Sequence, residues 1–411
     1  MKQNKASVLL KEAIQGEPKN KIIDTLLSQE VPKQSLSRIA QFLKILNRTK
    51  INLVLLKSLS FGGIPTECEG LRGIVWRLLF GQFPPETAKW EEFLKMRQSQ
   101  YNDFKNDLVI IPALPKTQFD QAIEVEDHPL SLSANSRWYM FFKDDDARKQ
   151  INKDIRRTKA NVAFFKEVAY SSEESKNSSL FIPSKAEITG LDAEPELFNR
   201  EGETHRHVLA RILLIYSKLN LGVNYVQGMN ELLATIYYCL YKYSPKMLMP
   251  YLESDAFFCF SALMGEVRDE YMREMDSEDS GINGKLQLIT DLVGKLDPEL
   301  YDFFKENNIT VNSFGLRWVM LLLAQDLEIE DVIRLWDTLL SDNERFLFFN
   351  YVLVQVILDG KEKALEAPRH TINKVLGNLM EGIDLIKILE KAGALLTKDR
   401  DKEEYNAKQY P

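Results

Sequence analysis

Arg157 lies in a setting suited to chemistry on a phosphate group. It ends the helical pattern of Ile151-Asn-Lys-Asp-Ile-Arg-Arg-Thr158, and Asp154 precedes it by three positions, so the two side chains can meet on one helix face. A guanidinium is planar and permanently charged, and it can make several parallel hydrogen bonds to a phosphoryl group. An ordinary interpretation stays open for this segment alone, in which its arginines complement the dipole of a helix C-terminus.

Gln227 is the second candidate, in the segment Asn224-Tyr-Val-Gln-Gly-Met-Asn230. The apolar helical repeat begins at Met229, so Gln227 is predicted to lie in the connection before a helix. Gly222 and Gly228 flank it, and glycine lets a backbone bend tightly or approach a partner closely. A carboxamide can donate one hydrogen bond while accepting another, which suits it to orienting a water molecule. A glutamine that only braces its own turn remains an alternative.

A third motif, Gly70-Leu-Arg-Gly-Ile-Val-Trp-Arg-Leu-Leu79, favours a structural role over direct chemistry. Arg72 and Trp76 lie four positions apart and therefore share a helix face. We expect Trp76 to bury its ring and Arg72 to pack or pair beside it.

The elements that position these residues are predicted to be helices almost throughout. Apolar residues recur at helical spacing in two clear runs, and alternating strand patterns are rare. The two apolar runs are Leu209, Ile212, Leu213, Tyr216 and Leu219, followed by Met229, Leu232, Leu233, Ile236 and Leu240. No internal repeat of fixed period stands out, so a solenoid is not expected. An all-α architecture of packed helices follows.

Composition shifts divide the chain into predicted regions. Residues 1–60 form an N-terminal helical extension, and the main domain spans 61–395, opening at Phe61-Gly-Gly-Ile-Pro65. A polar stretch at about 170–203 has low apolar density and is predicted to be a flexible insertion. Residues 396–411 form a charged C-terminal tail that we expect to fray.

Composition also excludes several classes of protein. The 411 residues carry 53 Lys and Arg against 60 Asp and Glu, and this net charge of −7 argues against a generic nucleic-acid or anionic-membrane binder. Three scattered cysteines make neither a disulfide framework nor a zinc site. His205 and His207 are interpreted as a solvated helix start rather than metal ligands. The longest apolar stretch, Phe346 to Leu358, is predicted to be a buried helix, so we expect no transmembrane segment and a cytoplasmic protein.

The three motifs, in this order, resemble those of the TBC-domain family of Rab GTPase-activating proteins. The family pattern is Arg-x-x-x-Trp, then Ile-x-x-Asp-x-x-Arg, then Tyr-x-Gln-Gly, and each motif has a match here. The matching residues are Arg72 and Trp76; Ile151, Asp154 and Arg157; and Tyr225, Gln227 and Gly228. Later segments are similar too: Asp255-Ala-Phe-Phe-Cys-Phe260, Phe314 with Arg317-Trp318, and Arg334-Leu-Trp-Asp337. Three stretches look like one member in particular: Glu126-Asp-His-Pro-Leu130, Ser136-Arg-Trp138 and Gly228-Met-Asn-Glu231.

The resemblance implies a V-shaped, two-lobed helical domain that accelerates GTP hydrolysis by a Rab GTPase and so regulates vesicle trafficking. It implies that Arg157 is an arginine finger and Gln227 a glutamine finger, both supplied in trans. Asp154, Tyr225, Gly228 and Asn230 are expected to orient the fingers or contact the partner.

The expected partner is a GTP-bound Rab, with no nucleic acid. The sequence has no Gly-x-x-x-x-Gly-Lys-Ser/Thr phosphate loop, so we expect the chain to bind no cofactor itself and the Rab to carry GTP and Mg²⁺. No serine elbow, catalytic cysteine setting or paired-carboxylate motif indicates an enzyme acting on its own substrate. Membrane association is expected to be peripheral and indirect, through the Rab.

The chain departs from the family pattern at two points, and the first of them keeps a catalytically weak Rab-binding adaptor as the alternative function. Ala160 occupies a position where the family often has proline, so the loop after Arg157 could be looser. Arg157 and Gln227 are also further apart than is usual, because the polar insertion lies between them, although a long surface insertion costs little stability.

Overall fold

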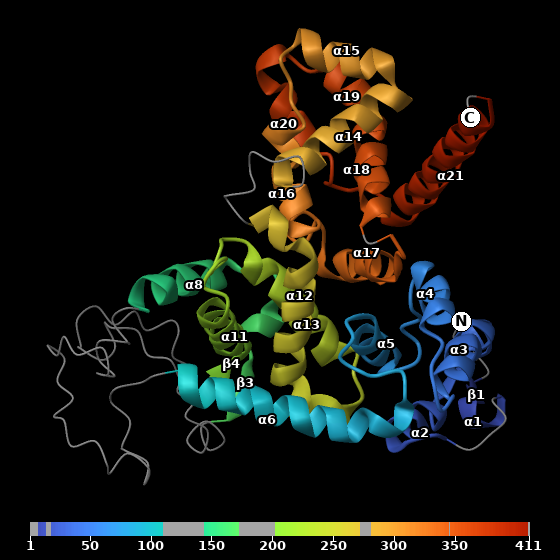
Figure 1. Ribbon diagram of the computed structural model, residues 1–411, viewed down its shortest axis with the longest axis vertical. Helices are drawn as coiled ribbons and strands as arrows, with labels where there is room; N and C mark the ends of the chain where they lie inside the picture. Colours follow the sequence, from blue (N-terminus) through green and yellow to red (C-terminus); the bar gives the residue numbers. More distant parts are fainter. Residues whose placement is uncertain are drawn as a thin grey trace, which may run out of the picture. The chain divides into compact units, whose positions relative to one another are not determined.

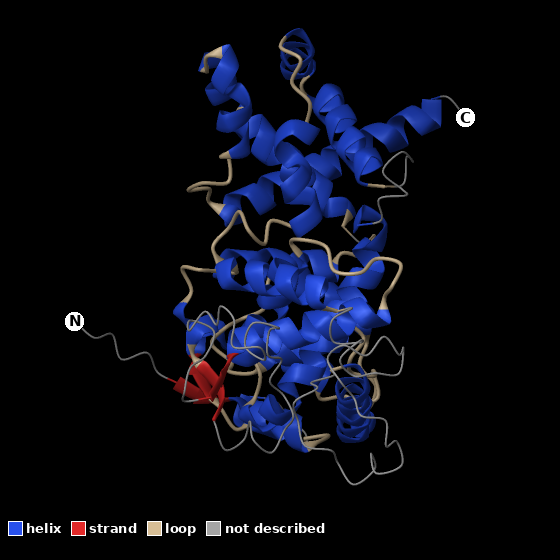
Figure 2. Ribbon diagram, turned by 90° about the vertical axis from the view of Figure 1, so that its left-hand side faces the viewer, coloured by secondary structure: helices blue, strands red, loops and turns tan. Residues whose placement is uncertain are grey.

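The computed structural model describes residues 7–13, 18–109, 144–171, 202–271, 281–344 and 346–409. Helices dominate these residues, and the strands form only two short antiparallel pairs (Figure 1; blue and red in Figure 2). The all-α prediction is therefore confirmed. The motif stretches at Glu126–Leu130 and Ser136–Trp138 lie outside the described residues, as does most of the predicted insertion.

The chain divides into two compact units. The first unit comprises Met1–Glu91, Tyr238–Met249 and Ala262–Pro411, and the second comprises Glu92–Tyr237 and Pro250–Ser261.

The elements mainly in the first unit are β1 (Ser7–Leu9), α1 (Leu10–Ala13), α2 (Lys21–Leu27), β2 (Glu30–Pro32), α3 (Lys33–Leu46), α4 (Leu53–Phe61), α5 (Leu71–Leu79), η1 (Thr87–Lys89), η5 (Lys246–Tyr251), η6 (Arg268–Tyr271), α14 (Ile282–Leu296), α15 (Pro298–Glu306), α16 (Asn312–Leu321), α17 (Ile329–Ser341), α18 (Leu347–Asp359), α19 (Lys361–Glu366), η8 (Arg369–Thr371), α20 (Ile372–Gly377) and α21 (Leu385–Gln409). Those mainly in the second are α6 (Trp90–Leu108), α8 (Asp145–Arg157), η3 (Ala163–Lys166), β3 (Val168–Ser171), β4 (Gly202–Thr204), α11 (His205–Leu219), α12 (Met229–Lys242) and α13 (Leu252–Val267).

The core of the first unit includes α18, whose residues Phe348 to Ile357 are all buried, as predicted for this apolar stretch. Helix α18 packs against α21, and α17 packs against α4. The N-terminal extension, residues 1–60, is part of this unit. The end of α4 is tied to α17, because the Thr338 hydroxyl donates to the carbonyl of Phe61. Helices α4 and α17 thus position the loop that carries Ile64.

Helix α21 continues from the predicted main domain into the charged tail and ends at Gln409. Asp399 anchors this helix, because its buried carboxylate accepts from the hydroxyl of Tyr351 and pairs with Lys295. Burying a charge requires such partners, and here they hold α21 against the body of the first unit.

In the second unit, α8 and α12 bury the apolar stripes that their spacing predicts. Ile151 and Ile155 of α8 are buried, and α8 packs on α11. Strands β3 and β4 pair antiparallel, with Val168 opposite Thr204 and Ser171 opposite Gly202. The two ends of the predicted insertion therefore meet in one short antiparallel ribbon.

Candidate functional site

Helix α8 ends at the candidate arginine. The backbone N–H of Thr158 bonds to the carbonyls of Asp154 and Ile155, and the next residue, Lys159, has a left-handed φ of 42° that turns the chain away. The Arg157 side chain is 59% exposed, and its Nη2 lies 2.6 Å from Oδ1 of Asp154. The predicted pairing of these residues is therefore present, and it leaves much of the guanidinium accessible to a partner.

Asp154 is 2% exposed and holds several groups at once. Its Oδ2 accepts from the hydroxyl of Tyr225 at 2.8 Å and from the side-chain amide of Gln150 at 3.1 Å. Burial and the Asp154 carboxylate raise the pKa of Tyr225 well above its usual range, so the phenol stays protonated and keeps donating. Gln150 was not recognised from the sequence, although its position one helical turn before Asp154 was a signal.

The Gln227 loop is built from two left-handed positions, Asn224 with a φ of 57° and Gly228 with a φ of 103°. Asparagine and glycine tolerate this conformation best, which explains the residue types on either side of the loop. Gln227 itself is exposed, and among the described residues none hydrogen-bonds to its side-chain amide. The loop presents this carboxamide outward, as predicted.

Asn230, in the first turn of α12, ties the two loops together. Its Oδ1 accepts from the backbone N–H of Gly228 at 3.1 Å, and its Nδ2 donates to the hydroxyl of Thr158 at 2.9 Å. The Thr158 hydroxyl in turn donates to the carbonyl of Asp154. Both Asn230 and Thr158 are buried, so these bonds are shielded from water. Thr158 was not recognised from the sequence, and only its place directly after Arg157 pointed to it.

Ala160 is exposed in the turn after α8. Contacts from this turn to the start of α12 come from its other residues: the Thr158 hydroxyl accepts from Asn230, and the backbone of Lys159 donates to the carboxylate of Glu231. The absence of a proline at 160 therefore removes none of these contacts.

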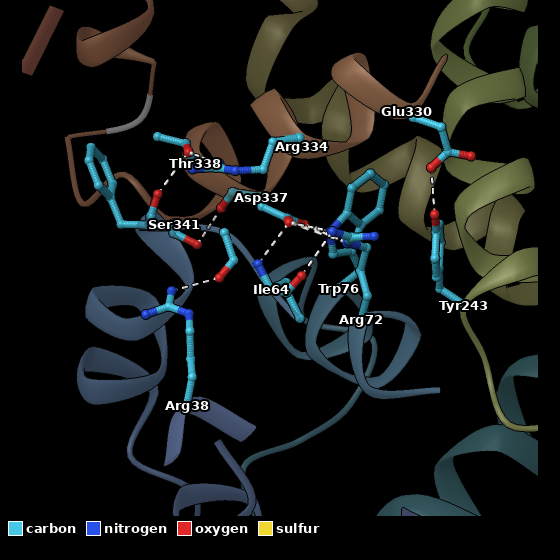
Figure 3. A network of polar contacts seen from close by, with 12 residues as sticks. Arg38, Ile64, Arg72, Trp76, Tyr243, Glu330, Arg334, Asp337, Thr338 and Ser341 are labelled. Atoms are coloured by element: carbon cyan, nitrogen blue, oxygen red, sulfur yellow. Dashed lines mark hydrogen bonds and ion pairs between the residues drawn. The ribbon is translucent and has the colours of Figure 1, made fainter. Parts of the chain in front are cut away.

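Arg72 and Trp76 lie in the first unit and meet the same carboxylate, that of Asp337 on α17 (Figure 3). Asp337 is fully buried and accepts from the Arg72 guanidinium at 3.1 Å and from the Trp76 indole N–H at 2.8 Å. It also accepts from the backbone N–H of Ile64 at 3.0 Å. Burial lowers the pKa of Arg72, but the Asp337 carboxylate more than offsets this and raises it overall. This cluster joins α5, α17 and the 62–67 loop.

The two helix-start histidines have structural roles. His207 and Thr204 form a capping box at the start of α11. His205 is buried, with its ring stacked on Phe164 and its Nδ1 2.8 Å from the hydroxyl of Tyr237, so the expectation of a solvated histidine is wrong for this residue. Burial lowers the pKa of His205 to about 4.

Within the described ranges, no group of three or more His, Cys, Asp or Glu side chains could hold a metal ion. In the same ranges, no helix combines the length and hydropathy needed to cross a membrane.

The structure places six of the eight candidate residues in the second unit: Asp154, Arg157, Tyr225, Gln227, Gly228 and Asn230.

Comparison with known proteins gives consistent matches. A family model described as RabGAP-TBC, the Rab-GTPase-TBC domain, matches residues 189–365. Two proteins named TBC1 domain family member 13, from Mus musculus and Homo sapiens, are each 33% identical over 392 residues, which cover 87% of this chain and 98% of theirs. A TBC domain-containing protein of Schizosaccharomyces pombe is 30% identical over 390 residues, covering 76% of this chain and 63% of its own.

Among solved structures, the Ypt/Rab-GAP domain of Gyp1p matches with a TM-score of 0.63 at 22% identity, covering 87% of this chain and 97% of that one.

Proposed function

The chain belongs to the Rab-GTPase-TBC domain family, and from this premise we propose that it accelerates GTP hydrolysis by a Rab-family GTPase through Arg157 and Gln227. The family predicted from the order of the motifs is confirmed, as is the particular similarity to TBC1 domain family member 13. The observation that carries the finger assignment is the buried Asp154, which binds Arg157 with one oxygen and Tyr225 of the Gln227 loop with the other.

GTP hydrolysis needs stabilisation of the charge that develops on the transferring phosphoryl group, and it needs an aligned water molecule. The exposed guanidinium of Arg157 suits the first task, since the ion pair with Asp154 restricts its orientation and still leaves it accessible. The exposed carboxamide of Gln227 suits the second, since it can donate to a phosphate oxygen and accept from water. The bonds from Asn230 and Tyr225 fix the separation of the two loops before any partner arrives, which lowers the entropic cost of assembling the site.

In this proposal the Rab carries GTP and Mg²⁺, because the sequence has no phosphate-loop motif of its own. Association with membranes is peripheral and follows the lipid-anchored partner. Regulation of vesicle trafficking then follows from shortening the lifetime of the GTP-bound Rab.

The test is single-turnover phosphate release from a panel of GTP-loaded Rabs with this protein added. An arginine supplied in trans is worth roughly 10³–10⁵ in rate, so Arg157→Ala and Arg157→Lys should each lower stimulation by at least about 100-fold. Gln227→Ala should have a comparable effect, because the water loses its orienting amide. Arg156→Ala removes a neighbouring exposed arginine and serves as the matched control, with stimulation kept.

Stimulation that survives changes at both Arg157 and Gln227 would refute the two-finger mechanism. The adaptor alternative, to which the departure at Ala160 points, predicts a different pattern. A GTP-loaded Rab would bind the unchanged chain, but no Rab on the panel would hydrolyse GTP faster in its presence.

A further inference from the structure

The first unit has an open cavity of about 530 Å³ at one end of α17, beside the Asp337 cluster. This volume is in the range of pockets that hold small-molecule ligands. Its lining comes from α3, the loop after α4, α5 and α17: Gln34, Ser35, Arg38, Gly62, Gly63, Ile64, Pro65, Thr66, Glu67, Arg72, Glu330 and Arg334. Segments far apart in the sequence thus bring three arginines to one cavity.

Two of these arginines, Arg38 and Arg334, form no ion pair within the part of the chain that the structure describes. Arg38 donates from Nη2 to the carbonyls of Leu59 and Gly63, at 3.0 and 2.7 Å. Arg334 donates from Nη1 to the hydroxyl of Thr338 at 2.8 Å (Figure 3). Neutral acceptors fix the direction of a guanidinium without cancelling its charge, so both arginines can still bind an anion.

The charges around Arg334 also favour an incoming anion. Burial lowers the pKa of Arg334, and the positive charges of Arg72 and Arg38 lower it further, although Asp337 acts in the opposite direction. A bound anion would stabilise the charged form of Arg334, because an opposite charge at close range favours the protonated guanidinium.

The acidic residues near the cavity are already engaged. Asp337 is bound by Arg72 and Trp76, and Glu330 is bound by Lys242 and Tyr243. Glu67 is exposed at the rim and accepts from the hydroxyl of Ser35. Asp337 and Glu330 therefore form their ion pairs with residues other than Arg38 and Arg334.

Two adjacent glycines allow the arginines to approach the loop. A Cβ at Gly62 would lie 3.0 Å from Nη2 of Arg38, and a Cβ at Gly63 would lie 2.6 Å from Nε of Arg334. Gly63 also has a left-handed φ of 90°, which a side chain would strain. The absence of side chains at Gly62 and Gly63 thus lets both guanidiniums lie close to the backbone of this loop.

We propose that this cavity binds a phosphate monoester through Arg38 and Arg334, on either a free polyol phosphate or a phosphorylated lipid headgroup. A phosphate monoester carries nearly two negative charges and offers three acceptor oxygens, so it can engage two guanidiniums from different helices. A carboxylate carries one charge and matches this arrangement less well.

The full chain is titrated with inositol trisphosphate by calorimetry, and it is sedimented with vesicles containing phosphatidylinositol bisphosphate. Vesicles of phosphatidylserine at equal total charge control for nonspecific attraction. Arg38→Gln and Arg334→Gln should each weaken binding of the phosphate monoester about tenfold or more, and Glu67→Gln should strengthen it severalfold. Arg369→Gln removes an exposed arginine of the same unit outside the cavity and should leave affinity unchanged.

The two binding arms separate the possible sources. Equal affinity for free inositol trisphosphate and for the phosphorylated vesicles indicates a soluble ligand, whereas much tighter vesicle binding indicates the lipid headgroup. No binding in either arm would overturn the proposal, as would affinity that is unchanged in Arg38→Gln/Arg334→Gln or weakened equally by Arg369→Gln. These measurements need no GTPase, so they are independent of the proposed function.

Each arginine variant is also checked for folding by its thermal unfolding midpoint. Gly63→Ala provides a second route that keeps every charge, because its Cβ would displace the Arg334 guanidinium. It should weaken binding as Arg334→Gln does, and unchanged affinity in a variant whose Arg334 has moved would count against the site.

Discussion

Tyr225 donates its hydroxyl to Asp154 at 2.8 Å across 71 positions of sequence, and the other oxygen of the same carboxylate holds Arg157. One buried carboxylate therefore joins the two loops that carry the proposed fingers. Asp154 is nearly inaccessible, whereas the Arg157 side chain is 59% exposed, so the carboxylate is held in place while the guanidinium stays open to water.

Replacing Tyr225 with phenylalanine tests this connection. A hydrogen bond to a charged group is worth about 1.5–3 kcal/mol, so Tyr225→Phe should lower the free energy of unfolding by about that amount. It should also reduce GTPase stimulation severalfold, because Asp154 orients Arg157 less firmly. Urea unfolding and single-turnover hydrolysis measure the two effects. Tyr251→Phe, in the same unit, is the control, and an equal loss there would refute a specific role for Tyr225.

The bond between Asn230 and Thr158 predicts measurable coupling. A double-mutant cycle with Asn230→Ala and Thr158→Val should give an interaction energy of about 0.5–3 kcal/mol, because the side chains are buried and 2.9 Å apart. Denaturant unfolding of the four proteins provides the value. Strictly additive losses would show that the two residues act independently.

Asp337 should be among the residues of the first unit least tolerant of change. Asp337→Ala leaves the buried guanidinium of Arg72 without its counter-charge, and breaking one side of a buried ion pair costs about 3–5 kcal/mol. The urea unfolding midpoint checks this loss. Asp331→Ala removes an exposed carboxylate from the same helix and should cost far less. Equal losses at the two positions would contradict a central role for Asp337.

Burial of His205 predicts a dependence of stability on pH. Its pKa is lowered from 6.5 to about 4 in the folded chain, so the unfolded chain takes up a proton first as the pH falls. The stabilisation is fully present above pH 6.5 and is lost between there and pH 4, by about 3 kcal/mol at 1.36 kcal/mol per pH unit.

Unfolding free energies of the natural chain and His205→Gln should therefore change by different amounts between pH 7 and 4.5. The comparison is needed because carboxylates titrate in the same window. His370→Gln, at an exposed histidine, should follow the natural chain. If His205→Gln also follows it, the histidine is not protected from protonation as its burial implies.

Local spacing in the sequence was enough to predict the features that depend only on residues within one or two helical turns of each other. The apolar repeats predicted α11 and α12, and the three-residue spacing predicted the contact between Asp154 and Arg157. The glycines around Gln227 indicated an outward-facing loop. These features are readable because helix geometry fixes which side chains share a face, whatever the rest of the chain does.

Only the tertiary structure decided the long-range partners. Arg72 was expected to pair, but its partner Asp337 lies 265 positions away, and the burial of His205 depends on Phe164 and Tyr237. Spacing along one helix cannot select such partners, because they depend on which helices pack together.

The Arg157 and Gln227 loops show both sides of this division. The sequence by itself determined the all-helical class, the family through its ordered motifs, and the residue types suited to phosphate chemistry. The tertiary structure decided that Tyr225 and Asn230 bind the residues beside Arg157, and that Arg38 and Arg334 line one cavity. Hydrogen bonds between distant residues form only after packing has brought the donor and acceptor atoms within about 3 Å of each other, and the local sequence around either residue does not encode that geometry.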